Sequence, residues 1–169
     1  MPQSAGMTVG KYLIRRLEQG GLKHIFGVPG DYVLKFYDLL EASEIKVVCA
    51  CNELNAGYAA DAYARLRGLG AVCVTYGVGG FSVLNAVAGA FVERSPLFVI
   101  SGGPRLSLRK DSEPCLLHHT LENKQVELEI FRKVTASASA AGSRETVVSG
   151  TKGPGSPHGC ATMSMGISR

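Results

Sequence analysis

The sequence has no tryptophan and only 7% aromatic residues, so it offers few side chains on which nucleic-acid bases could stack. Its formal net charge is only +4, and its lysines and arginines are scattered. We therefore expect no nucleic-acid partner. The sequence also lacks any run of about 18 apolar residues and any basic, apolar leader at its start. We expect no membrane segment and a cytoplasmic location.

Common metal and nucleotide motifs are missing as well. The five cysteines form no CxxC pair, and no histidine stands at zinc-finger spacing from them. Cys49, Cys51 and Cys73 lie in apolar runs, where we expect small buried hydrophobic side chains. The glycine-rich turns GVPGD (27–31) and GVGG (77–80) do not fit GxGxxG, and a Walker lysine is absent. A nucleotide-binding α/β protein is thus the weakest of three alternatives.

What is present is an alternation of helical and strand patterns. Thr8 is a candidate cap for a helix that Gly20 and Gly21 end, and Asp31 is the candidate cap of the next helix. Between the helices lie continuous apolar runs of strand length, which are typical of strands buried on both faces. The sequence therefore predicts an α/β fold, an open parallel sheet with helices on both faces. The predicted strands are HIFGV, IKVVCAC, AVCVTY and PLFVISG, with one more short strand at RKVTA. The predicted helices are TVGKYLIRRLEQ, DYVLKFYDLLEAS, ELNAGYAADAYARL, GFSVLNAVAGAFVE and TLENKQVELEIF.

The composition changes near Ser137. From there to Arg169 about two thirds of the residues are Ser, Gly, Ala, Pro or Thr, and none is aromatic. Such a segment buries too little surface to offset the entropy lost on ordering. We expect a domain over residues 1–136 and a low-complexity tail over 137–169 that is disordered or non-native.

Ionisable residues follow the strands. Asp31 follows the first strand, Glu53 follows the second, and His118 and His119 close a loop of about fifteen residues. Because the carboxyl ends of parallel strands meet at one edge of the sheet, these side chains are expected to converge. Structural roles are the alternative, with Asp31 as a helix N-cap, Glu53 against a helix N-terminus and solvated histidines.

Glu53 has the more unusual setting of these residues. Cys49, Cys51, Leu54 and small alanines are expected to surround it with apolar atoms. Desolvation raises the pKa of a carboxyl group, so we expect Glu53 to act as a proton donor near neutral pH.

Four motifs, in order and at consistent separations, resemble a known family. They are similar to the N-terminal pyrimidine-binding domain of thiamine-diphosphate-dependent 2-oxo acid decarboxylases, of the pyruvate, indolepyruvate and phenylpyruvate decarboxylase type. The resemblance runs from about residue 8 to about residue 136. The motifs are FGVPGDYVLKFYDLL, CNELNAGYAADAYAR, VTYGVGGFSVLNAVAGAFVERSPLFVISG and LLHHTLE.

The resemblance implies roles for individual residues. Glu53 matches the glutamate that hydrogen-bonds the aminopyrimidine of the cofactor and promotes its imino tautomer, which activates the thiazolium carbon. Asp31, His118 and His119 match proton relays that act after carbon dioxide leaves. Cofactor contacts are implied for a further set of residues: Gly30, Thr75, Gly77 and Val78.

The sequence departs from the family in one respect. It has no Gly-Asp-Gly start of a diphosphate-binding motif, so we expect no metal ligand here, although full-length members hold magnesium and thiamine diphosphate. We expect a truncated or frameshifted decarboxylase fragment, inactive alone, whose full-length form converts a 2-oxo acid to an aldehyde and carbon dioxide. The second alternative is a non-catalytic module that pairs with full-length subunits through helices 54–66 and 81–92. The expected assembly is a homo-oligomer or a pairing with full-length subunits.

Overall fold

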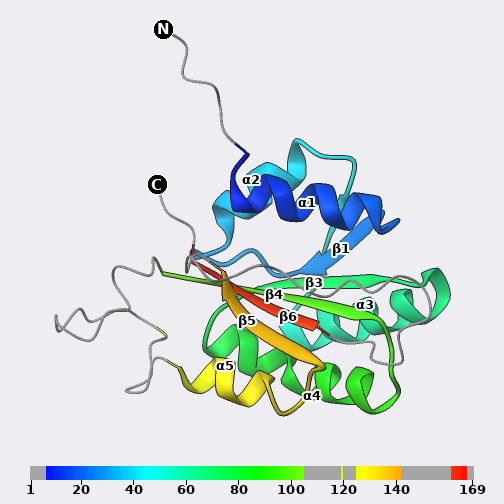
Figure 1. Ribbon diagram of the computed structural model, residues 1–169, viewed down its shortest axis with the longest axis vertical. Coiled ribbons are helices and arrows are strands. Elements are labelled where there is room, and N and C mark those ends of the chain that lie inside the picture. The colour runs from blue at the N-terminus through cyan, green and yellow to red at the C-terminus, as the bar shows by residue number, and fades with distance from the viewer. Residues whose placement is uncertain (1–6, 105–118, 120–124, 142–160, 167–169) are drawn as a thin grey trace, which may run out of the picture.

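The computed structural model describes residues 7–104, 119, 125–141 and 161–166, with side chains described as far as Ala140. Helices and strands alternate along most of this range, as predicted (Figure 1). The helices are α1 (Val9–Gln19), α2 (Leu34–Glu41), α3 (Glu53–Arg67), α4 (Val78–Val92) and α5 (Val126–Phe131). The strands are β1 (His24–Gly27), β2 (Lys46–Cys49), β3 (Gly70–Thr75), β4 (Leu97–Gly103), β5 (Ser137–Ala141) and β6 (Ala161–Gly166).

The strands form one sheet in the order β2-β1-β3-β4-β6-β5, and every neighbouring pair is parallel. All six residues of β3 are buried, because helices cover both of its faces. In Figure 1, α1 and α2 lie above the sheet, and α3, α4 and α5 lie below it. The predicted α/β architecture is confirmed.

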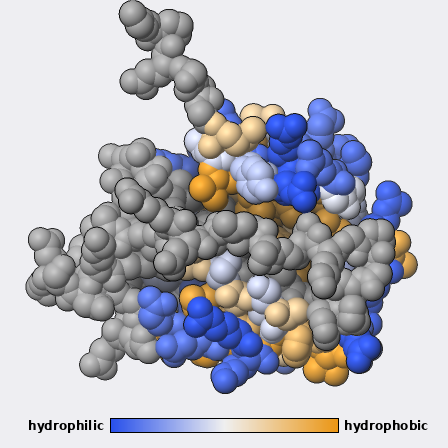
Figure 2. Space-filling model, in the orientation of Figure 1, coloured by the Kyte–Doolittle hydropathy of each residue, from blue (hydrophilic) through white to orange (hydrophobic). Residues whose placement is uncertain are grey.

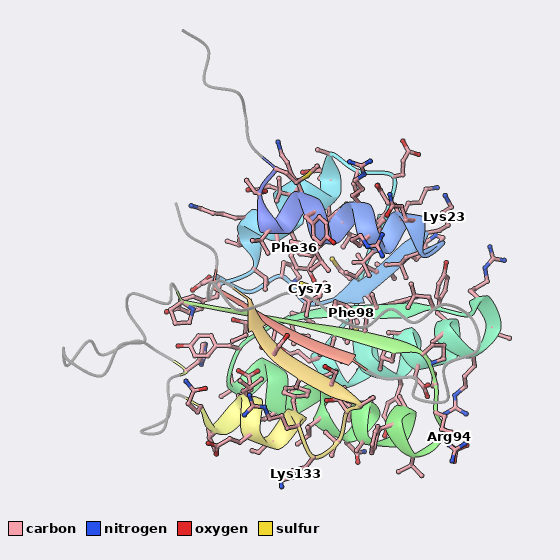
Figure 3. All side chains as sticks on the ribbon, in the orientation of Figure 1. Lys23, Phe36, Cys73, Arg94, Phe98 and Lys133 are labelled. Atoms are coloured by element: carbon pink, nitrogen blue, oxygen red, sulfur yellow. The ribbon has the colours of Figure 1, made fainter. Side chains whose placement is uncertain are left out.

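Alternate residues of β3 point into two separate cores. Ala71 and Cys73 belong to the core beneath α1 and α2, where Phe36 is fully buried (Figure 3). Val72 and Val74 belong to the core above α3 and α4, which also contains Phe131 of α5. This two-sided burial explains why the strands read as unbroken apolar runs in the sequence. No helix within the described ranges is long and apolar enough to span a membrane.

Local signals fix some of the helix ends. The Thr8 hydroxyl caps α1 by accepting a hydrogen bond from the backbone N–H of Lys11, as predicted. The α2 prediction was wrong in one detail, because the N-cap is Val33 and Asp31 lies in the preceding turn. Asp31 is therefore not the N-cap residue of α2.

Two cysteines do not lie where the sequence suggested. Cys73 is buried on β3, but Cys49 and Cys51 are exposed. The physical reason is the place of β2, which is the edge strand of the sheet and carries mostly exposed residues. The predicted apolar enclosure of Glu53 by these two cysteines was wrong.

The segment after residue 136 contains two short strands, where the sequence suggested no ordered structure. β5 begins at Ser137, just after the short strand predicted at 132–136, and pairs with β6. β6 pairs in turn with β4, so small residues extend the parallel sheet at this edge. The predicted domain boundary at residue 136 stays a prediction, and residues 142–160 and 167–169 lie outside the described residues.

Tyr37 joins α2 to the centre of the sheet. Its hydroxyl donates a hydrogen bond of 2.9 Å to the carbonyl oxygen of Cys73. Burial raises the pKa of the Tyr37 phenol above its ordinary value, and burial also raises the pKa of the Cys73 thiol. The folded chain thus holds both protons to higher pH than the unfolded chain. Their contribution to stability is complete below about pH 8.5 and declines as the pH rises through the ordinary pKa values.

We therefore expect the free energy of unfolding to fall above about pH 9, by up to about 1.4 kcal/mol per pH unit for each of these groups. Tyr37→Phe should cost about 1 kcal/mol at neutral pH through the lost hydrogen bond, and should make the alkaline decline shallower. Urea denaturation between about pH 7 and about pH 10.5 measures both effects. Tyr12→Phe is the matched control, because Tyr12 is exposed on α1. Equal alkaline slopes for the two variants would contradict the expectation.

Candidate cofactor-binding site

The candidate site lies where β1 and β3 end and where α3 and α4 begin. Gly30, in the turn after β1, lies directly against Thr75, the last residue of β3. A Cβ atom at Gly30 would lie 2.8 Å from the Thr75 Cβ, which is too close for any side chain. The rings of Tyr32 and Tyr76 also meet edge to face at 4.9 Å between centroids. These contacts place the turn that carries Asp31 beside Thr75 and Gly77.

Glu53 is the first residue of α3, and Asn52 caps that helix by accepting from the Asn55 N–H at 2.9 Å. The Glu53 side chain is half-buried and reaches α4. Its Oε1 lies 3.5 Å from the position that a Cβ of Gly79 would take. The carboxyl group of Glu53 is therefore beside the N-terminal turns of two helices, where a negative charge is favoured.

The turn between β3 and α4 has an unusual backbone. Gly77 has φ +67°, a left-handed conformation that favours glycine, and it is the N-cap of α4. The backbone carbonyl of His119 fills the space where a Gly77 side chain would be. His119 is exposed and itself has φ 64°.

The predicted site residues thus fall into three groups. Gly30, Thr75, Gly77 and Glu53 come together, with the His119 backbone against Gly77. Asp31 and Val78 are exposed in the adjoining turns. His118 lies outside the described residues. Within the described ranges, no three His, Cys, Asp or Glu side chains gather into a group that could hold a metal ion.

Similarity to known proteins shows the family of the chain. Residues 7–130 match the family described as "Thiamine pyrophosphate enzyme, N-terminal TPP binding domain". The chain belongs to this family. It is 49% identical over 135 residues to "Pyruvate decarboxylase 1" of Oryza sativa subsp. japonica, covering 78% of this chain and 22% of that protein. It is 50% identical over 131 residues to "Pyruvate decarboxylase 1" of Arabidopsis thaliana, covering 76% of this chain and 21% of that protein. The chain thus spans about a fifth of the length of these relatives.

The residues present fit the pyrimidine end of thiamine pyrophosphate. The Thr75 side chain is buried, and its Oγ1 has no hydrogen-bond partner within the described part of the chain. Such an atom is costly unless a further group satisfies it. Gly30 and Gly79 let the backbone pack directly against the Thr75 side chain. An acid and a buried hydroxyl at one edge of the sheet can together hold a flat, polar heterocycle.

Sequence reasoning missed four residues near this site. Gly79 contacts both Thr75 and Glu53, and Gly80 contacts the carboxyl group of Glu127. The Ser101 hydroxyl of β4 donates a 2.6 Å hydrogen bond to Glu127 Oε1. One signal was available, because Glu127 is four residues before the apolar Phe131 and therefore shares its face of a helix. The sequence alone did not show that this face is buried.

Proposed function

We propose that the chain supplies the pyrimidine-binding half of a thiamine-diphosphate-dependent 2-oxo acid decarboxylase. The observation that supports this proposal is the Glu53 carboxyl group against the first turn of α4, next to the Thr75 hydroxyl, which has no hydrogen-bond partner among the described residues. The substrate class is 2-oxo acids such as pyruvate or indolepyruvate, which the whole enzyme would convert to an aldehyde and carbon dioxide. A cytoplasmic location is part of the same proposal.

Each residue has a task in this proposal. When bound, thiamine diphosphate supplies the carbanion chemistry of the reaction. Glu53 would hydrogen-bond a ring nitrogen of the aminopyrimidine and exchange a proton with it. The Thr75 hydroxyl and the backbone at Gly30, Gly77 and Val78 would orient the ring and exclude water. Asp31, His118 and His119 would move protons at the substrate end. Magnesium and the diphosphate would be held by a separate domain.

The isolated chain should therefore bind thiamine diphosphate weakly and show no measurable decarboxylation. Each charge-assisted contact to the diphosphate that is missing costs about 1.5–3 kcal/mol, so loss of two such contacts weakens binding by at least about a hundredfold. Calorimetric titration with thiamine diphosphate and Mg²⁺ tests this, with and without a separately supplied diphosphate-binding domain. Turnover by the chain alone would contradict the expectation. Absence of binding even with the second domain would refute the proposed function.

A second candidate is a non-catalytic module that pairs with full-length decarboxylase subunits. Apolar side chains on α3 and α4 favour it, since Leu66, Val92 and Tyr58 are 85%, 75% and 48% exposed. Figure 2 shows apolar surface at the lower edge, where Figure 1 places α4. If the chain co-purifies with a full-length subunit, and Glu53→Gln in the chain leaves this co-purification unchanged, the result would favour this function over catalysis.

A further inference from the structure

The structure contains a second acid beside α4 that the proposed chemistry does not use. Glu127 lies in the first turn of α5 and is 8% exposed. Its Oε1 accepts a 2.6 Å hydrogen bond from the Ser101 hydroxyl, which is fully buried on β4. Burying a carboxyl group lowers the stability of the fold unless hydrogen bonds or an opposite charge compensate for the lost hydration. The other neighbours of the Glu127 carboxyl group show which part of the structure its negative charge can stabilise.

The carboxyl group of Glu127 occupies the place that a Gly80 side chain would fill. Its Oε1 is the nearest atom to a Cβ built at Gly80, and Phe131 Cε2 follows at 3.4 Å. Gly80 is the third residue of α4, within the turn whose N–H groups have no acceptor inside the helix. α4 provides no cap of its own, because its N-cap is Gly77 and its first turn contains no acidic residue.

Acids from two other helices lie against this uncapped turn. Glu53 of α3 lies at Gly79, and Glu127 of α5 lies at Gly80. Successive residues of an α-helix are rotated by about 100°, so the two carboxyl groups approach the first turn of α4 from different sides. A negative charge at this end of a helix is stabilising. Together the two acids hold the turn between α3 on one side and α5 on the other.

We propose that Glu127 is a positioning residue for the cofactor-binding turn. Its carboxyl group fixes the first turn of α4, and through it Gly79, against which Glu53 lies. Glu127 itself does not touch the cofactor. The part of this inference that concerns the cofactor rests on the proposed function, whereas the part that concerns the turn does not.

Amide hydrogen exchange in the full 169-residue chain, followed by NMR without ligand, tests the role in the turn. First-turn amides have no acceptor within their helix, so their exchange rate reports how firmly the groups packed around the turn hold it. We expect Glu127→Gln to speed exchange at Gly79 and Gly80 by about tenfold, because a partly buried negative charge at a helix N-terminus stabilises that turn by up to about 2 kcal/mol. Ser101→Ala, a milder change that leaves the acid in place, should act in the same direction. Glu129→Gln is the matched control, since Glu129 is exposed on the same helix.

An NMR titration of the same variants with thiamine diphosphate tests the link to the cofactor. The dissociation constant should rise by about tenfold for Glu127→Gln and stay unchanged for Glu129→Gln. Unchanged exchange at Gly79 and Gly80 in both Glu127→Gln and Ser101→Ala would overturn the inference. Faster exchange with an unchanged dissociation constant would overturn the role toward the cofactor. If the unsubstituted chain does not bind thiamine diphosphate even when the diphosphate-binding domain is supplied, the proposed function fails, and the exchange comparison still decides whether Glu127 holds the turn.

Discussion

Glu53→Gln is expected to lower decarboxylation by about two to four orders of magnitude, the range that general acid–base catalysis contributes. Glutamine keeps the size and polarity of the side chain, but it cannot exchange a proton with a ring nitrogen. The measurement needs a complete site, so residues 7–130 would be grafted into the Arabidopsis thaliana relative with which they align. Steady-state turnover with a saturating 2-oxo acid and cofactor then reports the loss.

Two controls separate this role from a structural one. If Glu53 only complements the positive end of α3, glutamine should cost about 0.3–1 kcal/mol of stability and leave turnover intact. Asn52→Ala removes the actual N-cap hydrogen bond, so it should cost about 1 kcal/mol with little effect on the chemical step. Glu41→Gln alters an exposed acid of α2, on the other side of the sheet, and should change neither quantity. Turnover of the Glu53→Gln graft equal to that of the unaltered graft would refute the role.

The sequence was sufficient for the sheet and for one end of the site because both depend on local patterns. The unbroken run from Gly70 to Thr75 indicated burial on both faces, and β3 does separate two cores. Parallel pairing then requires that residues following β1 and β3 meet at one edge, which brings Gly30 to Thr75. The approach of Gly30 to Thr75 follows from parallel strand pairing alone, without knowledge of which helices pack together.

The parts that failed depend on which elements are neighbours across the sheet. Cys49 and Cys51 lie in an apolar run, but the strand order puts that run at an open edge. Glu127 is one of two acids spaced two residues apart on α5, and only packing against α4 buries one and leaves the other exposed.

Gly57→Leu is expected to lower the free energy of unfolding by about 3 kcal/mol or more, because it overpacks the contact between α3 and α4. A Cβ at Gly57 would lie 2.6 Å from Val83 Cγ2 and 2.7 Å from Ala86 Cβ. The Ala86 Cβ cannot move without the α4 backbone, so the two helices must separate. That separation also draws Glu53, at the start of α3, away from Gly79.

Gly89→Leu provides the matched comparison, since it makes the same change in a helical glycine with no atom within 4 Å of an added Cβ. Replacing a glycine inside a helix removes a penalty of about 0.8–1 kcal/mol, so this variant should be as stable as the original chain or slightly more stable. The two variants should therefore change the urea midpoint in opposite directions, although both add the same side chain to neighbouring helices. If Gly57→Leu were as stable as Gly89→Leu, α3 and α4 would not be in close contact, and the placement of Glu53 beside Gly79 would lose its structural support.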